Sequence, residues 1–153
     1  MSSNEIEING TPFEYVGFWS RLGASIIDSI IIIVITLPTL YLIYGGDYFN
    51  SEEFIQGFSD VIISYVFPLL ATILFWIYKC ATPGKIALSV KIVDAKTGNN
   101  PTVRQSIIRY LGYYVSLIPL GLGFLWIAWD AKKQGWHDKM AGTVVIRSKN
   151  KGV

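Results

Sequence analysis

The stretch GFWSRLGASIIDSIIIIVITLPTLYLIY, residues 17–44, decides the fold, because it places one arginine and one aspartate in an otherwise apolar segment. From residue 22 to residue 44 the only charged side chain is that of Asp28. At about 1.5 Å of rise per residue, a helix over this stretch covers about 34 Å, enough to cross a hydrocarbon core. One buried aspartate costs about 3 kcal/mol, whereas the Ile, Leu and Val side chains together return about 6 kcal/mol. The segment is therefore predicted to span a membrane.

Arg21 and Asp28 are separated by seven residues, which is close to two helical turns. Both side chains consequently leave the same face of the helix, about 10.5 Å apart along its axis. The same face carries the hydroxyl groups of Ser25, Thr36 and Thr39. Polar side chains at membrane depth usually face protein or water, so we expect this face to be shielded from lipid.

The composition supports a small membrane protein with a single domain. The chain has 153 residues, of which 52% are hydrophobic and 16% charged, and it contains two further long uncharged blocks, residues 61–78 and 110–129. We predict an all-α membrane protein with three hydrophobic blocks. Its predicted parts are a flexible lead-in at residues 1–14, a membrane domain at 15–148 and a basic tail at 149–153.

Charge is distributed unevenly along the chain. Residues 1–78 hold one Lys or Arg and eight acidic residues, whereas residues 79–153 hold twelve Lys or Arg and three acidic residues. The positive-inside rule then places both termini in the cytoplasm and the acidic loop at 45–60 outside. We expect the first helix to act as an uncleaved signal anchor. The basic side is expected to attract anionic lipid headgroups, and nothing in the pattern indicates nucleic acid.

If residues 106–130, which contain the third block, crossed the membrane once without a break, the basic C-terminal segment would lie outside. We therefore predict a break at residues 119–123, which contain one proline and two glycines and would turn the block into a short helical hairpin. Residues 88–94 (LSVKIVD) and 142–148 (GTVVIRS) are rich in β-branched side chains. They predict a small cytoplasmic pair of strands.

Local signals mark the remaining turns. Thr102 and Gln105 have the spacing of a capping box, which predicts the start of a helix. Residues 81–85 (ATPGK) predict a turn at the basic interface, with Lys85 extended toward water. The single cysteine, Cys80, has no partner for an intramolecular disulfide and is expected to be a buried or interfacial thiol.

These motifs, taken in order, resemble those of the RDD family of small, mostly bacterial membrane proteins. The resemblance covers about residues 15–148. It rests on the spacing of Arg21 and Asp28 and on four further segments: TPGK at 82–85, VKIVD at 90–94, RQSIIR at 104–109 and WHDKMAGT at 136–143. The resemblance implies a multi-pass protein of the bacterial inner (plasma) membrane.

The resemblance also assigns roles to individual charged residues. It implies that Arg21 is the family arginine and Asp28 the first family aspartate. Asp138 in the HDKMAGT pattern matches the second aspartate best, and Asp130 is a weaker candidate. Transport, including cation/proton antiport for some members, has been suggested for this family.

Two functional interpretations remain open. In the first, Asp28 binds a proton or a monovalent cation in turn, and the hydroxyls of Ser25, Ser29 and Thr36 supply further oxygen ligands. In the second, the protein is a membrane scaffold that transports nothing, and Asp138 neutralises Arg21 in a structural cluster. The chain is short for a carrier and shows no internal repeat, so transport would require a homo-oligomer or a larger complex.

Other chemistries find little support in the sequence. One histidine and one cysteine provide no metal-ligand spacing, and no nucleophile has an adjacent base. We therefore predict no enzyme activity, no metal and no cofactor. His137, next to Asp138, is either a proton relay or, as is more usual for a lone histidine at a basic interface, a solvated or capping residue.

Overall fold

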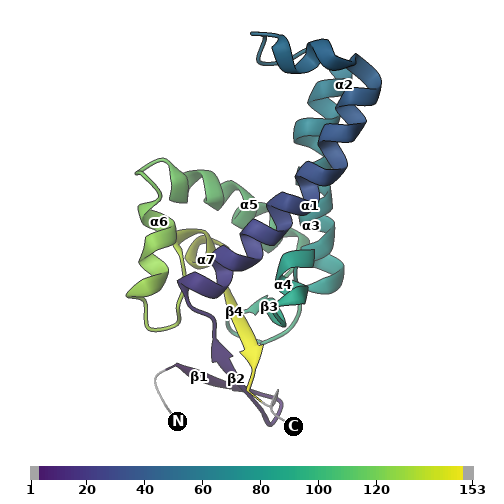
Figure 1. Cartoon of the computed structure of the whole chain (residues 1–153). Helices are drawn as coiled ribbons and strands as arrows, with labels where there is room; N and C mark the ends of the chain where they lie inside the picture. The colour runs from purple at the N-terminus through teal and green to yellow at the C-terminus, as the bar shows by residue number, and fades with distance from the viewer. Residues whose placement is uncertain (1–3, 150–153) are drawn as a thin grey trace.

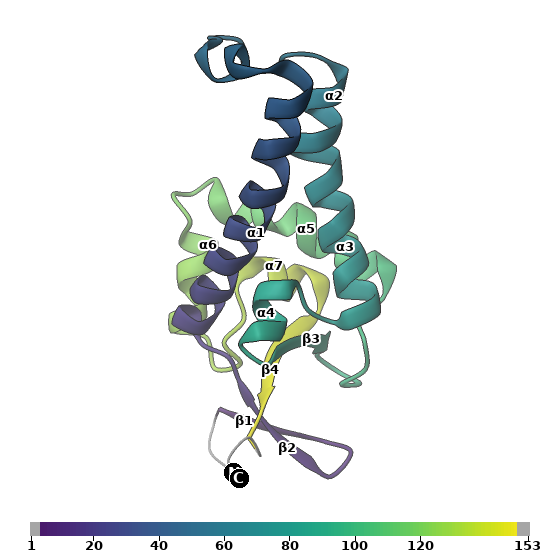
Figure 2. The ribbon, with the colours of Figure 1, turned by 45° about the vertical axis from the view of Figure 1, so that its right-hand side comes forward.

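A computed structural model of the protein describes residues 4–149, and two long helices dominate it (Figure 1). Helix α1 runs from Phe18 to Tyr44. A second continuous helix, Phe58–Lys79, consists of α2 (Phe58–Val61), a π-helical turn (Ile62–Val66) and α3 (Phe67–Lys79). The two helices run side by side toward a 3-10 turn, Gly46–Asn50, at the end far from the sheet (Figures 1 and 2).

Both long helices have the length and apolar composition needed to cross a membrane, as two of the three hydrophobic blocks predict. Large apolar side chains on their outer surfaces are exposed, with Val34 at 65% and Leu70 at 51%. Such surfaces are stable in lipid rather than in water. The π-helical turn ends two residues before Pro68, whose ring would clash with the carbonyl of Ser64 in a regular α-helix.

A four-stranded antiparallel sheet, in the order β1-β2-β4-β3, lies at the other end of the molecule. Its strands are β1 (Glu5–Ile8), β2 (Thr11–Tyr15), β3 (Val90–Asp94) and β4 (Thr143–Ser148). The predicted pairing of the last two segments is confirmed, because β3 pairs with β4 from Val90↔Arg147 to Asp94↔Thr143. Pairing of β2 with β4 also brings the two ends of the described chain together.

The prediction of a flexible lead-in at residues 1–14 is wrong for the part that the structure describes, and the sheet has four strands rather than two. Residues 5–15 form a hairpin whose turn is Asn9-Gly10, with positive φ at both residues. Phe13 is buried in an apolar cluster with Val93, Val144 and Ile146, so the hairpin is held by packing as well as by β2–β4 hydrogen bonds. Of the predicted basic tail at 149–153, only Lys149 lies within the described residues.

The third hydrophobic block bends where the sequence predicts a break. Helix α5 (Val103–Leu117) and the segment formed by α6 (Leu122–Leu125) and a 3-10 turn (Trp126–Ala128) meet at 110°. The intervening turn, residues 118–121, overlaps the predicted break at 119–123. The predicted capping box is confirmed as well: the Thr102 hydroxyl accepts a hydrogen bond from the Gln105 backbone N–H at 3.2 Å.

Two short helices fill the space between the long helices and the sheet (Figure 2). Helix α4 (Pro83–Ala87) packs on α1, and α7 (Trp136–Ala141) packs on α5. Trp76, near the end of α3, is fully buried against residues of the sheet, including Ile92 and Val145. The region where these elements meet contains the buried charged residues.

Candidate functional site

A buried carboxylate with two arginine partners lies where α1, α5 and α7 meet. Asp138, the third residue of α7, is 0% exposed. Its Oδ2 accepts a hydrogen bond from Arg21 Nη1 at 2.6 Å, and its Oδ1 accepts one from Arg109 Nη1. The backbone N–H of Gly135 donates to Oδ2 at 2.9 Å, so the same carboxylate caps its own helix. We call Arg21, Asp138 and Arg109 the Arg–Asp–Arg triad.

The triad connects elements that are far apart in the sequence. Arg21 Nε donates to the Val16 carbonyl at 2.9 Å, and Arg21 Nη2 donates to the Lys133 carbonyl. Arg109 Nη1 also donates to the Thr143 hydroxyl at 2.8 Å. The triad thereby fixes α1, α5, α7 and the start of β4 relative to one another, the geometry that the structural interpretation requires.

The role of Arg109 was not recognised from the sequence, which indicated only a basic start of a helix. The buried positions of α5 are Ser106, Arg109, Gly112 and Ser116. Their spacing of three or four residues forms one stripe of small and polar side chains along α5. That stripe was the available signal, because an arginine within it must enter the protein interior.

The two arginines keep Asp138 ionised. Burial alone would raise the pKa of the Asp138 carboxyl, but Arg109 and Arg21 outweigh this effect and hold the pKa well below its ordinary range. With two guanidinium groups and one carboxylate, the triad has a formal charge of +1. Removing the carboxylate would leave two buried cations without a counter-ion.

His137 is buried beside the triad rather than solvated. Its Nδ1 lies 3.2 Å from the Ser116 hydroxyl, and its ring packs edge-on against Tyr113 with centroids 4.6 Å apart. Burial lowers the pKa of His137 to about 3, although Asp138 opposes this shift. The imidazole is therefore neutral near pH 7, and its structure favours a packing role over the hypothesised proton relay.

The state of His137 leads to a testable pH dependence. An unfolded histidine binds a proton below about pH 6.5 and the folded one does not, so stability should fall by about 1.4 kcal/mol per pH unit below that value. The detergent-solubilised protein should therefore unfold at a lower temperature at pH 5 than at pH 7. Because the chain has one histidine, His137→Gln should remove most of this dependence. An equal slope in both proteins would contradict the assignment.

Asp28 lies apart from the triad. The Thr82 hydroxyl donates to its Oδ2, and the backbone N–H of Gly84 donates to its Oδ1 at 2.7 Å. Arg21 leaves the same helix as Asp28, but its guanidinium donates to the Asp138 carboxylate and to backbone carbonyls. The hydrogen bonds to the Asp28 carboxylate come from the turn before α4 and from α4 itself.

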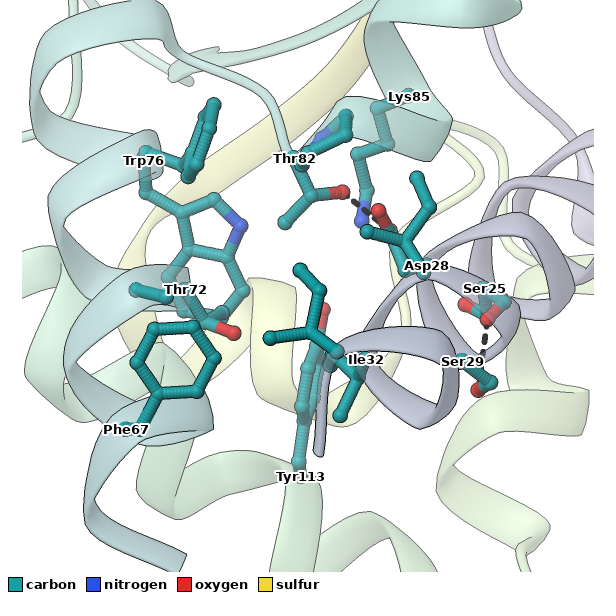
Figure 3. A pocket seen from close by; sticks show the side chains of 15 residues that line it. Ser25, Asp28, Ser29, Ile32, Phe67, Thr72, Trp76, Thr82, Lys85 and Tyr113 are labelled. Carbon is teal, nitrogen blue, oxygen red and sulfur yellow. Dashed lines mark hydrogen bonds between the residues drawn. The ribbon is translucent and has the colours of Figure 1, made fainter. Parts of the chain in front are cut away.

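A cavity of about 270 Å³ adjoins Asp28, between α1, α3, α4 and α5; we call it the Asp28 cavity (Figure 3). Trp76 and Lys85 point into it from different sides (Figure 3). Trp76 is 0% exposed, and its indole N–H has no hydrogen-bond partner within the described part of the chain. The prediction that Lys85 extends into water is wrong, because the turn folds back onto α1 and leaves this side chain only 5% exposed.

The hydroxyl residues predicted as oxygen ligands occupy different positions. Ser25 and Ser29 line the Asp28 cavity, and the Ser29 hydroxyl donates to the Ser25 carbonyl at 2.9 Å. Thr36 is absent from the described lining of this cavity and donates to the Ile32 carbonyl at 2.8 Å. The structure therefore groups Ser25 and Ser29 with Asp28, but not Thr36.

Asp130, the weaker candidate for the second family aspartate, lies outside the triad. Its carboxylate forms an ion pair with Lys139 and accepts hydrogen bonds from the backbone N–H groups of Lys132 and Gln134. These contacts organise the loop before α7. Only Asp138, of these two aspartates, contacts Arg21.

Two long apolar helices joined to a sheet by buried charges define a small integral membrane protein. The family model of the RDD family matches residues 15–142. The chain therefore belongs to the RDD family.

Three of the proteins to which the chain is similar are described as uncharacterized. The uncharacterized protein YxaI of Bacillus subtilis is 30% identical over 146 residues, covering 85% of this chain and 95% of the relative. YckC of the same organism, also uncharacterized, is 31% identical over 138 residues, covering 87% and 85%. An uncharacterized protein of Rickettsia prowazekii is 49% identical over 76 residues, which is 50% of this chain and only 42% of that relative. No solved structure gives a significant match.

Proposed function

We propose that the protein transports a small ion or solute across the membrane and binds it in the Asp28 cavity. The observation that carries this proposal is the set of polar groups facing the cavity. They are the Asp28 carboxylate, the buried Lys85 side chain and the indole N–H of Trp76, which has no hydrogen-bond partner among residues 4–149. Ionisable groups on spanning helices are costly and usually mark a pathway or a binding site.

The donors in the cavity favour a polar solute over a bare cation. A monovalent cation at Asp28 would meet the positive charge of Lys85 and make no use of the Trp76 N–H. A solute with a negatively charged group could bind Lys85 and Trp76, and its own donor group could bind Asp28. We therefore favour a small zwitterionic or amphoteric solute.

Exchange of a monovalent cation for protons is the second form of transport. It is favoured by the oxygen atoms near Asp28, which include the hydroxyls of Thr82 and Ser25. Competition between a cation and a proton for one carboxylate would couple the two fluxes. In this form the Lys85 side chain has to move away from Asp28 when the cation binds.

A scaffold without transport activity is the competing function. The observation in its favour is the Arg–Asp–Arg triad, whose side chains hold four elements together and are absent from the described lining of the Asp28 cavity. The triad has a structural role in both the transport and the scaffold interpretation, and the two differ in the role of Asp28. The positive-inside rule favours a cytoplasmic position for the end with the sheet in either case, and a carrier of this length would act as an oligomer.

Flux through proteoliposomes tests the proposal. The purified protein should accumulate labelled zwitterionic amino acids, or exchange Na⁺, K⁺ or Li⁺ for protons as monitored by an internal pH dye. Asp28→Asn and Lys85→Gln should each reduce the flux about tenfold or more, because each removes a charge-assisted contact. Asp47→Asn, at an exposed site in the distant turn, should leave the flux unchanged.

Two outcomes would contradict transport. The first is the absence of flux for every solute and cation tested, with protein that is folded by its thermal unfolding profile. The second is normal flux in Asp28→Asn. Loss of protein from the membrane in Asp28→Asn, without any flux in the parent protein, would support the scaffold.

A further inference from the structure

A second cavity, of about 490 Å³, lies between α1, α4, α5 and α6 and shares Ser25, Lys85 and Tyr113 with the lining of the Asp28 cavity; we call it the cationic cavity. Three basic side chains line it, those of Arg21, Lys85 and Arg109. Most of its remaining wall is apolar, with side chains that include Phe18, Leu22, Leu120, Phe124 and Leu125. A cavity with cations at one place and hydrocarbon elsewhere matches an amphiphile with a negative headgroup.

The positive charge of this cavity is only partly compensated. Arg21 and Arg109 share the single carboxylate of Asp138, and His137 is neutral, so the wall and its buried counter-ion have a formal charge of +2. Arg109 Nε is buried without a hydrogen-bond partner among residues 4–149. Lys85 forms no salt bridge with any carboxylate in the same part of the chain. The cavity therefore retains unused donor capacity for an anion.

The position of the cations matches the depth of lipid headgroups. Arg21 lies in the first turn of α1, and Lys85 follows shortly after the end of the helix Phe58–Lys79. The start of α1 and the end of the helix Phe58–Lys79 both lie on the side of the sheet, so the cations lie at one end of the two apolar helices (Figure 2). When such helices cross a bilayer, that level is the boundary between headgroups and acyl chains.

Apolar side chains at the edge of the cavity are exposed rather than covered by protein. Leu120, in the bend between α5 and α6, is 99% exposed, and Leu22 and Leu125 are 39% and 41% exposed. In a membrane these side chains would contact acyl chains. The apolar wall is thus continuous with the surface that lipid would cover.

We propose that the cationic cavity binds one anionic phospholipid, with its phosphate near Lys85 and Arg109 and its acyl chains along the apolar wall. Phosphate oxygens accept charge-assisted hydrogen bonds from guanidinium and ammonium groups, and a net negative headgroup also neutralises the excess charge. A zwitterionic headgroup compensates less, because it brings its own cation. This site differs from the Asp28 cavity in the rest of its lining, but Lys85 lines both cavities, so the lipid proposal and the solute proposal share this one cation.

Lipid added to the delipidated, detergent-solubilised protein tests this inference. Phosphatidylglycerol should raise the thermal unfolding midpoint by about 4 °C at saturating concentration and remain bound in native mass spectrometry. Phosphatidylcholine with the same acyl chains should do neither. Glycerol 3-phosphate, which has the phosphate but no acyl chains, should displace the lipid only weakly; displacement at equal concentration would overturn a lipid site in favour of a soluble phosphate site.

Matched variants separate this site from surface attraction and from transport. Lys85→Gln should weaken phosphatidylglycerol binding about tenfold, whereas Lys79→Gln, which removes an exposed lysine at the end of α3, should not. Lys85→Arg should restore binding. Asp28→Asn should bind the lipid normally even if its flux is lost. Equal binding of both lipids, or equal losses in the two glutamine variants, would overturn the proposal.

Discussion

Replacing Asp138 by asparagine is expected to destabilise the protein by about 3–5 kcal/mol, the typical cost of breaking a buried ion pair from one side. Asparagine keeps the shape but removes the charge that neutralises Arg21 and Arg109, which are 7% and 1% exposed. Since folded domains have a total stability of about 5–15 kcal/mol, a large fraction of the protein should be lost. Membrane abundance by immunoblot and thermal unfolding in detergent measure this loss.

Asp130→Asn is the matched control for this prediction. Asp130 makes its ion pair with Lys139, whose side chain is 45% exposed. Such pairs contribute about 1 kcal/mol or less, so the protein should remain abundant. Equal losses of abundance and stability in the two variants would show that the triad stabilises the protein no more than the Asp130–Lys139 pair does.

A triple variant separates the structural role of the triad from any role in transport. Buried ion networks can often be replaced by apolar residues of similar size without loss of stability. Arg21→Met, Asp138→Leu and Arg109→Met together should therefore recover part of the abundance that Asp138→Asn loses. If flux recovers together with abundance, the role of the triad is structural. If abundance recovers and flux stays absent, the triad also has a role in transport.

Gly84→Ala is expected to have the second large effect, because α4 lies against the backbone of α1 at this residue. A Cβ atom at Gly84 would overlap the Ala24 carbonyl oxygen and lie 3.0 Å from Asp28 Cγ. The Ala24 carbonyl belongs to the α1 backbone and cannot rotate aside, so α4 has to move away from α1. That movement breaks the hydrogen bond from the Gly84 N–H to Asp28. Overpacking of this kind costs about 1–3 kcal/mol.

Thermal unfolding and flux of the same preparation measure the effect of Gly84→Ala. The unfolding midpoint should fall, and flux should fall further than stability explains, because Asp28 loses a contact that orients it. Gly46→Ala is the control, since a Cβ atom there meets nothing within 4 Å. Identical behaviour of the two alanine variants would mean that α4 does not pack on α1 as the structure shows.

The elements that the sequence predicted correctly depend on local patterns. The long apolar stretch around Asp28 predicted α1, the Thr102–Gln105 spacing predicted the start of α5, and β-branched runs predicted β3 and β4. Each of these signals lies within a few residues of what it predicts. The first hairpin also has a local signal, Asn9-Gly10, but the acidic, polar composition of the segment led to a prediction of flexibility.

The candidate site was predicted only in part, because its members come from distant segments. Arg21, Asp28 and Asp138 were recognised, and the contact of Arg21 with Asp138 was among the interpretations. The burial of Lys85, the pairing of Arg109 and the separation of Asp28 from the triad were not. These features depend on how α4 and α7 fold back between the helices, which no local pattern specifies.

The sequence by itself determined that this chain enters a membrane, that a carboxylate lies within its first spanning helix, and that it belongs with the RDD proteins. Hydropathy and helical periodicity are local properties, so they can be read without the fold. Only the tertiary structure decided which cation neutralises which carboxylate and where the cavities lie. Burial and charge pairing depend on contacts between residues more than a hundred positions apart, such as Arg21 and Asp138.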